Sequence, residues 1–123
     1  MVNLLDISSI DKFYNQMNGG KMQIIATTTW DVEPAHFVEF MANCLKAKEI
    51  HERLGAEQVR LVQSMAGPTP GLMYALIFSN GAAFGSFIDA TRTDEEWLAF
   101  WAEASQGNYA KIISQSVGQD LLS

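Results

Sequence analysis

Two histidines and a tyrosine are the side chains of this chain best suited to move a proton. His36 follows Glu33 near the expected start of a helix, and from there it could act as a general base at the mouth of a pocket. Tyr74 lies in an apolar segment, where its hydroxyl needs a hydrogen-bond partner. We predict His36 and Tyr74 as the catalytic pair. The simpler alternatives are a partly exposed histidine at a helix start and a tyrosine with a structural hydrogen bond.

The remaining candidates favour structural roles. His51 stands among charged neighbours (Lys48, Glu49, Glu52 and Arg53), which predicts a solvated surface residue. On one helix it would lie about 60° around the axis from His36, and no third ligand is near, so no metal site is expected. Cys44 falls in an apolar helical pattern and is predicted to be a small buried hydrophobe, not a nucleophile.

Composition limits the partners of this chain. It has 123 residues, 48% of them hydrophobic, which predicts one globular domain. Its 14 acidic against 8 basic residues give a net charge of −6, a field that opposes nucleic acid and anionic membranes as partners. The first residues lack a basic region followed by an apolar run, so no signal peptide is expected, and no apolar run is long enough to cross a bilayer. A cytoplasmic location is therefore expected.

The first half of the chain predicts two helices around a strand. Residues 1–20 carry apolar side chains at helical spacing and predict a separate N-terminal helical arm. Residues 22–30 are rich in Ile and Thr and predict a strand. Pro34 opens a helix that continues to Leu54, and Gly55 suits the position after its end.

The second half predicts a hairpin, an interrupted helix and a last strand. Strands are expected at 58–65 and 72–79, joined by the Gly- and Pro-rich residues 67–71. A helix at 82–90 is interrupted at 91–93, where Thr93 and Glu96 have the spacing of a capping box that starts the next helical segment. The last strand is expected at 111–117.

This order over residues 21–123 predicts a ferredoxin-like βαββαβ domain of the α+β class, with a four-stranded antiparallel sheet. The strand at 72–79 is apolar on both faces, with Tyr74 on one side and Met73 and Ala75 on the other. Because two helices cover only one face of so small a sheet, the other face needs a second layer. We expect a homodimer through this sheet face.

The chain resembles the dimeric α+β barrel superfamily, which includes small NIPSNAP-like and EthD-like proteins and antibiotic-biosynthesis and haem-degrading monooxygenases. The marks are the element order, Trp30 in the first strand, the Pro-Gly hairpin and the interrupted helix with Trp97 and Trp101 before a closing strand. The haem-degrading relatives are expected to carry a histidine on the second helix, but residues 81–106 contain none, so haem is not expected.

The resemblance implies a small apolar or aromatic molecule held between the helices and the sheet, with neither metal nor organic cofactor. It implies an enzyme of monooxygenase type or of isomerase or cyclase type, and the alternative is a ligand-binding or oligomerising module without turnover. The predicted ligand-binding residues are Trp30, Met65, Phe84, Phe87, Trp97 and Trp101.

Overall fold

The computed structural model describes residues 22–67 and 71–123, so the predicted N-terminal arm lies outside the described residues. The elements follow one another as β1 (Ile24–Val32), the 3-10 turn η1 (Pro34–His36), α2 (Phe37–Arg53), β2 (Gln58–Gln63), β3 (Leu72–Phe78), α3 (Gly81–Thr91), α4 (Glu95–Ser105) and β4 (Ala110–Gln119). The order confirms the predicted βαββαβ arrangement. The expected bounds differ most at the first and last strands, because β1 begins and ends two residues later and β4 is longer than expected.

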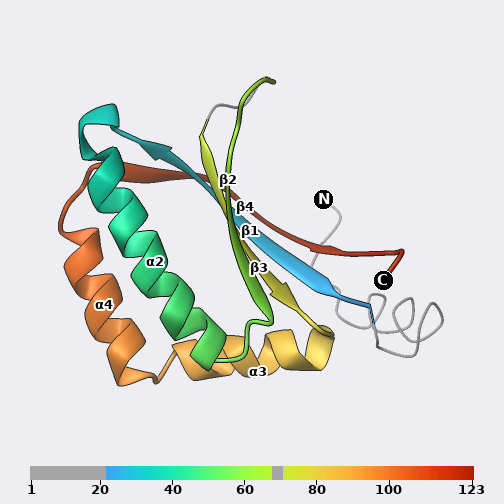
Figure 1. The fold of residues 1–123 in the computed structure, drawn as a ribbon. Coiled ribbons are helices and arrows are strands. Elements are labelled where there is room, and N and C mark those ends of the chain that lie inside the picture. The colour runs from blue at the N-terminus through green and yellow to red at the C-terminus, as the bar shows by residue number, and fades with distance from the viewer. Residues whose placement is uncertain (1–21, 68–70) are drawn as a thin grey trace, which may run out of the picture.

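The strands form one antiparallel sheet in the order β2-β3-β1-β4. Helices α2 and α4 lie side by side along one face of this sheet, and α3 crosses its lower end (Figure 1). The sheet is therefore covered by helices on one face, as the ferredoxin-like fold requires. No helix among residues 22–67 and 71–123 combines the length and apolarity that a membrane crossing needs.

Side-chain caps start the two later helices. The Asn80 side chain accepts a hydrogen bond from the Ala83 amide (2.8 Å) at the start of α3. The Asp94 carboxylate accepts one from the Trp97 amide (2.9 Å) at the start of α4. The predicted capping box of Thr93 and Glu96 is wrong: the cap is Asp94, one residue later, and Trp97 stands where a box would have Glu. A carboxylate next to the positive end of the helix dipole accepts the free amide better than a hydroxyl does.

The face of the sheet under the helices carries two buried clusters. One surrounds Phe78, which is fully buried and packs against Ile24, Ala56 and Phe87. The other contains Ala47, Ile50, Tyr74 and Phe100. The first cluster is closed by α3, whereas the second borders a cavity under α2 and α4.

The opposite face of the sheet is apolar along β3 and mixed along the strands beside it. In register, β3 places Met73 beside Val62 and Thr29, and Ala75 beside Thr27 and Arg60. Val62 is 45% exposed. This two-sided character of β3 agrees with the pattern from which a dimer was expected, and the dimer itself stays a prediction.

Candidate functional site

A cavity of about 670 Å³ opens between α2, α4 and the central strands of the sheet. Eight of its 22 lining residues are aromatic, and all three tryptophans of the chain are among them. The aromatic side chains are Trp30, Phe40, Tyr74, Phe87, Trp97, Phe100, Trp101 and Tyr109. Trp30 contacts both Phe40 and Trp101, with ring centroids 5.7 and 6.2 Å apart. Volume and lining are typical of a small-molecule site.

The structure gathers most of the residues predicted to bind a ligand. Four of the six, Trp30, Phe87, Trp97 and Trp101, line the cavity. Tyr74, which was predicted to be catalytic, lines it too, although β1, β3, α3 and α4 supply these residues from distant parts of the sequence. This grouping follows from strand pairing and from the way α4 folds back beside α2.

Two of the predicted ligand-binding residues lie elsewhere. Phe84 packs against Phe78 in the closed cluster, with ring centroids 5.2 Å apart. Met65 follows the end of β2 and is 92% exposed. Their aromatic or soft apolar character suggested a pocket, but Phe84 faces the core under α3 and Met65 extends beyond the covered sheet. The lining is corrected at both positions.

His51 is a candidate functional residue that the sequence analysis missed. It was predicted to be solvated, but it is only 5% exposed and lines the cavity. Its Nδ1 lies 2.7 Å from the Tyr74 hydroxyl, and its ring centroid lies 4.4 Å from that of Trp97. The missed signal was the spacing of Phe40, Cys44, Ala47 and His51, which places all four on the inner stripe of α2. The charged neighbours lie on its other sides.

Burial keeps the His51–Tyr74 pair neutral. It lowers the pKa of His51 from 6.5 to about 4. Burial also raises the pKa of Tyr74, and the charges at Cys44 and Glu52 add to the shift. Both effects arise because the charged forms lose their hydration inside the protein. At neutral pH the pair is therefore an uncharged imidazole hydrogen-bonded to a phenol.

One imidazole nitrogen stays available to a ligand. His51 bonds to Tyr74 through Nδ1, and Nε2 has no hydrogen-bond partner among the described residues. In that part of the chain no fully buried side-chain nitrogen or oxygen lacks a partner. Nε2 must therefore retain access to the cavity that His51 lines. A bound molecule can reach it directly.

Tyr109 shapes the exposed end of the cavity. Its hydroxyl accepts a hydrogen bond from the Asn43 amide (2.6 Å), and its main-chain oxygen accepts one from the Glu33 amide (2.9 Å). His36 stacks on the Tyr109 ring, with centroids 4.9 Å apart, and is not part of the lining. Its Nδ1 lies 3.1 Å from Glu39. The structure thus places His36 behind the rim, away from the His51–Tyr74 pair.

The lining of the cavity carries few charged side chains. None of the described residues around the cavity is Asp or Glu, although the chain as a whole has a net charge of −6. Cys44 lines it as a thiol, since burial raises its pKa to about 11. Among the described residues, no three His, Cys, Asp or Glu side chains gather in a way that could hold a metal ion.

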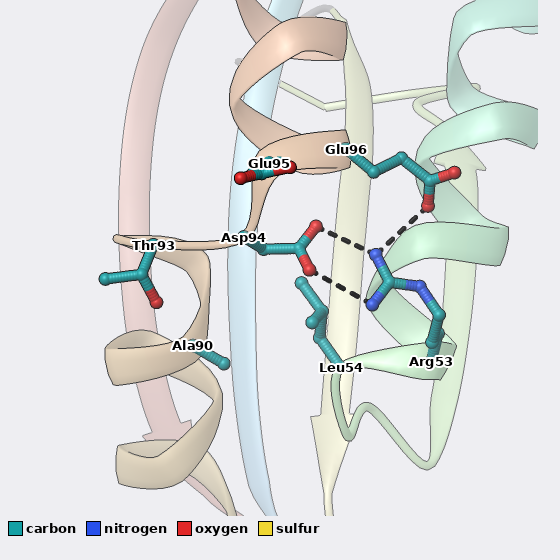
Figure 2. A pocket seen from close by; sticks show the side chains of 7 residues that line it. All are labelled: Arg53, Leu54, Ala90, Thr93, Asp94, Glu95 and Glu96. Carbon is teal, nitrogen blue, oxygen red and sulfur yellow. Dashed lines mark hydrogen bonds and ion pairs between the residues drawn. The ribbon is translucent and has the colours of Figure 1, made fainter.

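A second, shallower hollow lies where α2 ends and α4 begins (Figure 2). Arg53 binds both oxygens of Asp94 there, at 3.1 and 2.8 Å, and also Glu96 at 3.0 Å. The Asp94 carboxylate raises the pKa of Arg53, and Arg53 lowers the pKa of Asp94. These groups satisfy one another and connect the two helices that enclose the cavity. The arrangement is structural.

Solved structures share this fold at low sequence identity. A NIPSNAP-family protein of unknown function from Agrobacterium tumefaciens matches with a TM-score of 0.63 and 14% identity, over 81% of this chain and 89% of that chain. A DABB-family protein with a ferredoxin-like fold from Mesorhizobium loti matches at 0.55 and 13%, over 80% and 95%. A candidate monooxygenase from Shewanella loihica matches at 0.56 and 13%, over 80% and 93%.

These likenesses define the class of fold. The chain has the ferredoxin-like α+β fold, and its structural neighbours include NIPSNAP-family, DABB-family and monooxygenase-like proteins. The resemblance predicted from the sequence is thereby confirmed for the fold. Neither a protein-family profile nor a curated protein sequence matches the chain. Since one fold supports many reactions, the function has to be argued from the cavity.

Proposed function

We propose that this protein is a small-molecule enzyme that acts on an apolar or aromatic metabolite with its own side chains, without a metal or an organic cofactor. The observation that carries the proposal is the His51–Tyr74 pair, which is held at 2.7 Å in the wall of an aromatic cavity of about 670 Å³. Two structural neighbours are described as a candidate oxidoreductase and a candidate monooxygenase, and they support the same class.

The pair suits proton transfer to or from a flat ligand. Nε2 of His51 can take a proton from a ligand hydroxyl or an activated carbon, while Tyr74 orients the ring through Nδ1. Removing such a proton makes an aromatic ring more electron-rich, which serves a monooxygenase reaction with molecular oxygen. The same step forms the enolate that an isomerase or cyclase needs. His51 takes the role that the sequence analysis gave to His36.

A non-catalytic binding protein is the second candidate. The observation in its favour is the lowered pKa of His51, about 4, which makes the free imidazole a weak base at neutral pH. A ligand could then be held only by the aromatic walls and the hydrogen-bonding groups. Binding without turnover would be the result.

The deciding experiment compares binding with turnover in the same samples. Naphthohydroquinone is a suitable first probe, because the three cavity tryptophans report its binding by fluorescence and oxygen uptake reports its oxidation. For the enzyme we expect oxygen uptake above the buffer rate, reduced about 100-fold by Tyr74→Phe and His51→Asn. His36→Ala is the matched control and should retain activity. Binding without uptake or any ring product would favour the second candidate.

We also propose that the chain forms a homodimer through the outer face of the sheet. Met73 and Ala75 lie at the centre of this face, and Val62 beside them is 45% exposed. Partly exposed apolar side chains on the central strand β3 and an exposed one on the edge strand β2 favour coverage by a matching surface. Light scattering should give twice the chain mass, and Ala75→Arg should give single chains. A wild-type single chain at micromolar concentration would refute the dimer.

A further inference from the structure

One row of hydrogen-bonding side chains crosses the floor of the cavity. Thr28 in β1 is paired in register with Tyr74 in β3 on one side and with Gln115 in β4 on the other. All three residues line the cavity. Because residues opposite one another in a sheet point to the same face, their side chains form a line from His51 toward the open β4 edge.

The rows on either side of this line are apolar. Trp30 pairs with Leu72 and Ile112, and Ala26 pairs with Leu76 and Val117. The floor therefore has one row of polar side chains, Tyr74, Thr28 and Gln115, between two rows of apolar side chains. A ligand that lies flat on it meets hydrogen-bonding groups along one line only.

Two of the three polar side chains in this row, Thr28 and Gln115, have no hydrogen-bond partner among the described residues. Tyr74 is hydrogen-bonded to His51, whereas the Thr28 hydroxyl and the Gln115 amide make no hydrogen bond with another described side chain or main-chain group. An entirely apolar ligand would remove water from these groups and leave them unpaired, which opposes binding. A ligand with oxygen atoms at the same places would replace that water.

We infer that the metabolite bound here is a planar ring system with its oxygen functions along one edge, and that Thr28 and Gln115 recognise that edge. The apolar body lies between the aromatic walls, and the oxygenated edge follows the line of Tyr74, Thr28 and Gln115. One oxygen then lies beside the His51–Tyr74 pair. This inference rests on the proposed function, since it names the substrate class of the same cavity.

Two isomeric probes separate edge recognition from simple ring binding. Naphthoresorcinol has both hydroxyls on one edge of the ring, whereas naphthohydroquinone has them on opposite sides. Calorimetric titration under anaerobic conditions should show tighter binding of naphthoresorcinol. Thr28→Val and Gln115→Leu should each weaken it about fivefold, the loss expected for one hydrogen bond to a neutral group, with little change for the other isomer. Thr27→Val is the matched control, because Thr27 neighbours Thr28 but points to the outer face.

The outcomes distinguish the two proposals. Equal affinity for the isomers, unchanged in Thr28→Val and Gln115→Leu, would overturn edge recognition and leave the cavity as a binding site for flat rings. Failure of both isomers to bind the folded wild-type protein, with no change in tryptophan fluorescence, would overturn the proposed site as well. A loss in Thr27→Val as large as in Thr28→Val would show a general effect on the sheet and would also count against recognition.

Discussion

The two halves of the helix-covered layer are built from the same kinds of residue, but one is filled and the other encloses a cavity. Around Phe78 the rings interlock, with centroids 5.2 Å from Phe84 and 4.8 Å from Phe87, and α3 closes the layer. Around Tyr74 the rings also contact one another, with the centroids of His51 4.4 Å and Phe100 5.7 Å from that of Trp97, but together they enclose a cavity. We refer to these as the closed half and the open half. Phe87 belongs to both, since it packs on Phe78 and also lines the cavity.

Helix placement explains the difference. Helix α3 lies across the end of the sheet, and α4 lies beside α2 (Figure 1). Phe87 of α3 packs on Phe78, with ring centroids 4.8 Å apart, whereas Trp97, Phe100 and Trp101 of α4 line the cavity. Arg53 connects α2 to the first turn of α4 through Asp94 and Glu96. These ion pairs fix α2 and α4 to each other above the cavity of the open half. Aromatic content alone does not decide between core and site; the way the helices cover it does.

The largest change in stability should come from removing a buried ring from the closed half. Phe78→Ala removes a fully buried ring and should destabilise the protein by about 3–5 kcal/mol, because the tightly packed neighbours cannot collapse into the space. Urea unfolding followed by circular dichroism measures the loss. A cost below about 1 kcal/mol would mean that this half is loosely packed too, and the contrast would disappear.

Low pH should reduce the free energy of unfolding through His51 in the open half. Since the pKa of His51 falls from 6.5 unfolded to about 4 folded, the unfolded chain binds the proton more readily. The stability contributed by neutral His51 is complete above pH 6.5 and is lost as the pH falls toward 4, a change of about 3 kcal/mol. Unfolding free energies measured across this range should decline less steeply in His51→Gln. Equal slopes in both proteins would place His51 in a solvated position after all.

The cap of α3 should have an intermediate effect. Asn80→Ala removes the acceptor for the Ala83 amide and should cost about 1 kcal/mol of stability. Because α3 closes only one half, ligand binding in the open half should change little. Thermal unfolding and tryptophan fluorescence titration, run on one sample, test both parts. Strong loss of binding would mean that the two halves are coupled through Phe87.

The smallest stability change should come from the edge of the open half. Trp101 is 41% exposed and borders empty space, so Trp101→Ala should cost less than about 1 kcal/mol. Binding of naphthoresorcinol should nevertheless weaken, because a cavity wall is lost. Calorimetry measures that loss directly. A destabilisation as large as that of Phe78→Ala would show that Trp101 belongs to the core.

Much of the fold could be predicted from the sequence, because it depends on local patterns. The strands at 58–65 and 72–79, the helix break at 91–93 and the helix with Trp97 and Trp101 follow from periodicity and from turn and cap residues. The structure confirms these elements, with bounds that differ by up to two residues. Five of the residues predicted around the pocket also lie there, since large aromatic side chains on inward-facing positions must meet under the helices.

Three features could not be predicted in this way. The burial of His51 depends on α4 covering that side of α2, which local charge pattern does not reveal. The stacking of His36 on Tyr109 joins residues far apart in sequence. The row of Tyr74, Thr28 and Gln115 depends on pairing register, which includes a shift between Thr29 and Trp30.

By itself, the sequence determined the order of elements and which faces of the strands are apolar, because backbone preference and hydrophobic spacing act within a few residues. Only the tertiary structure decided that half of the aromatic layer closes into a core and half stays open as a cavity. That outcome depends on where three helices come to rest on one sheet, and on which polar groups this leaves unpaired between them.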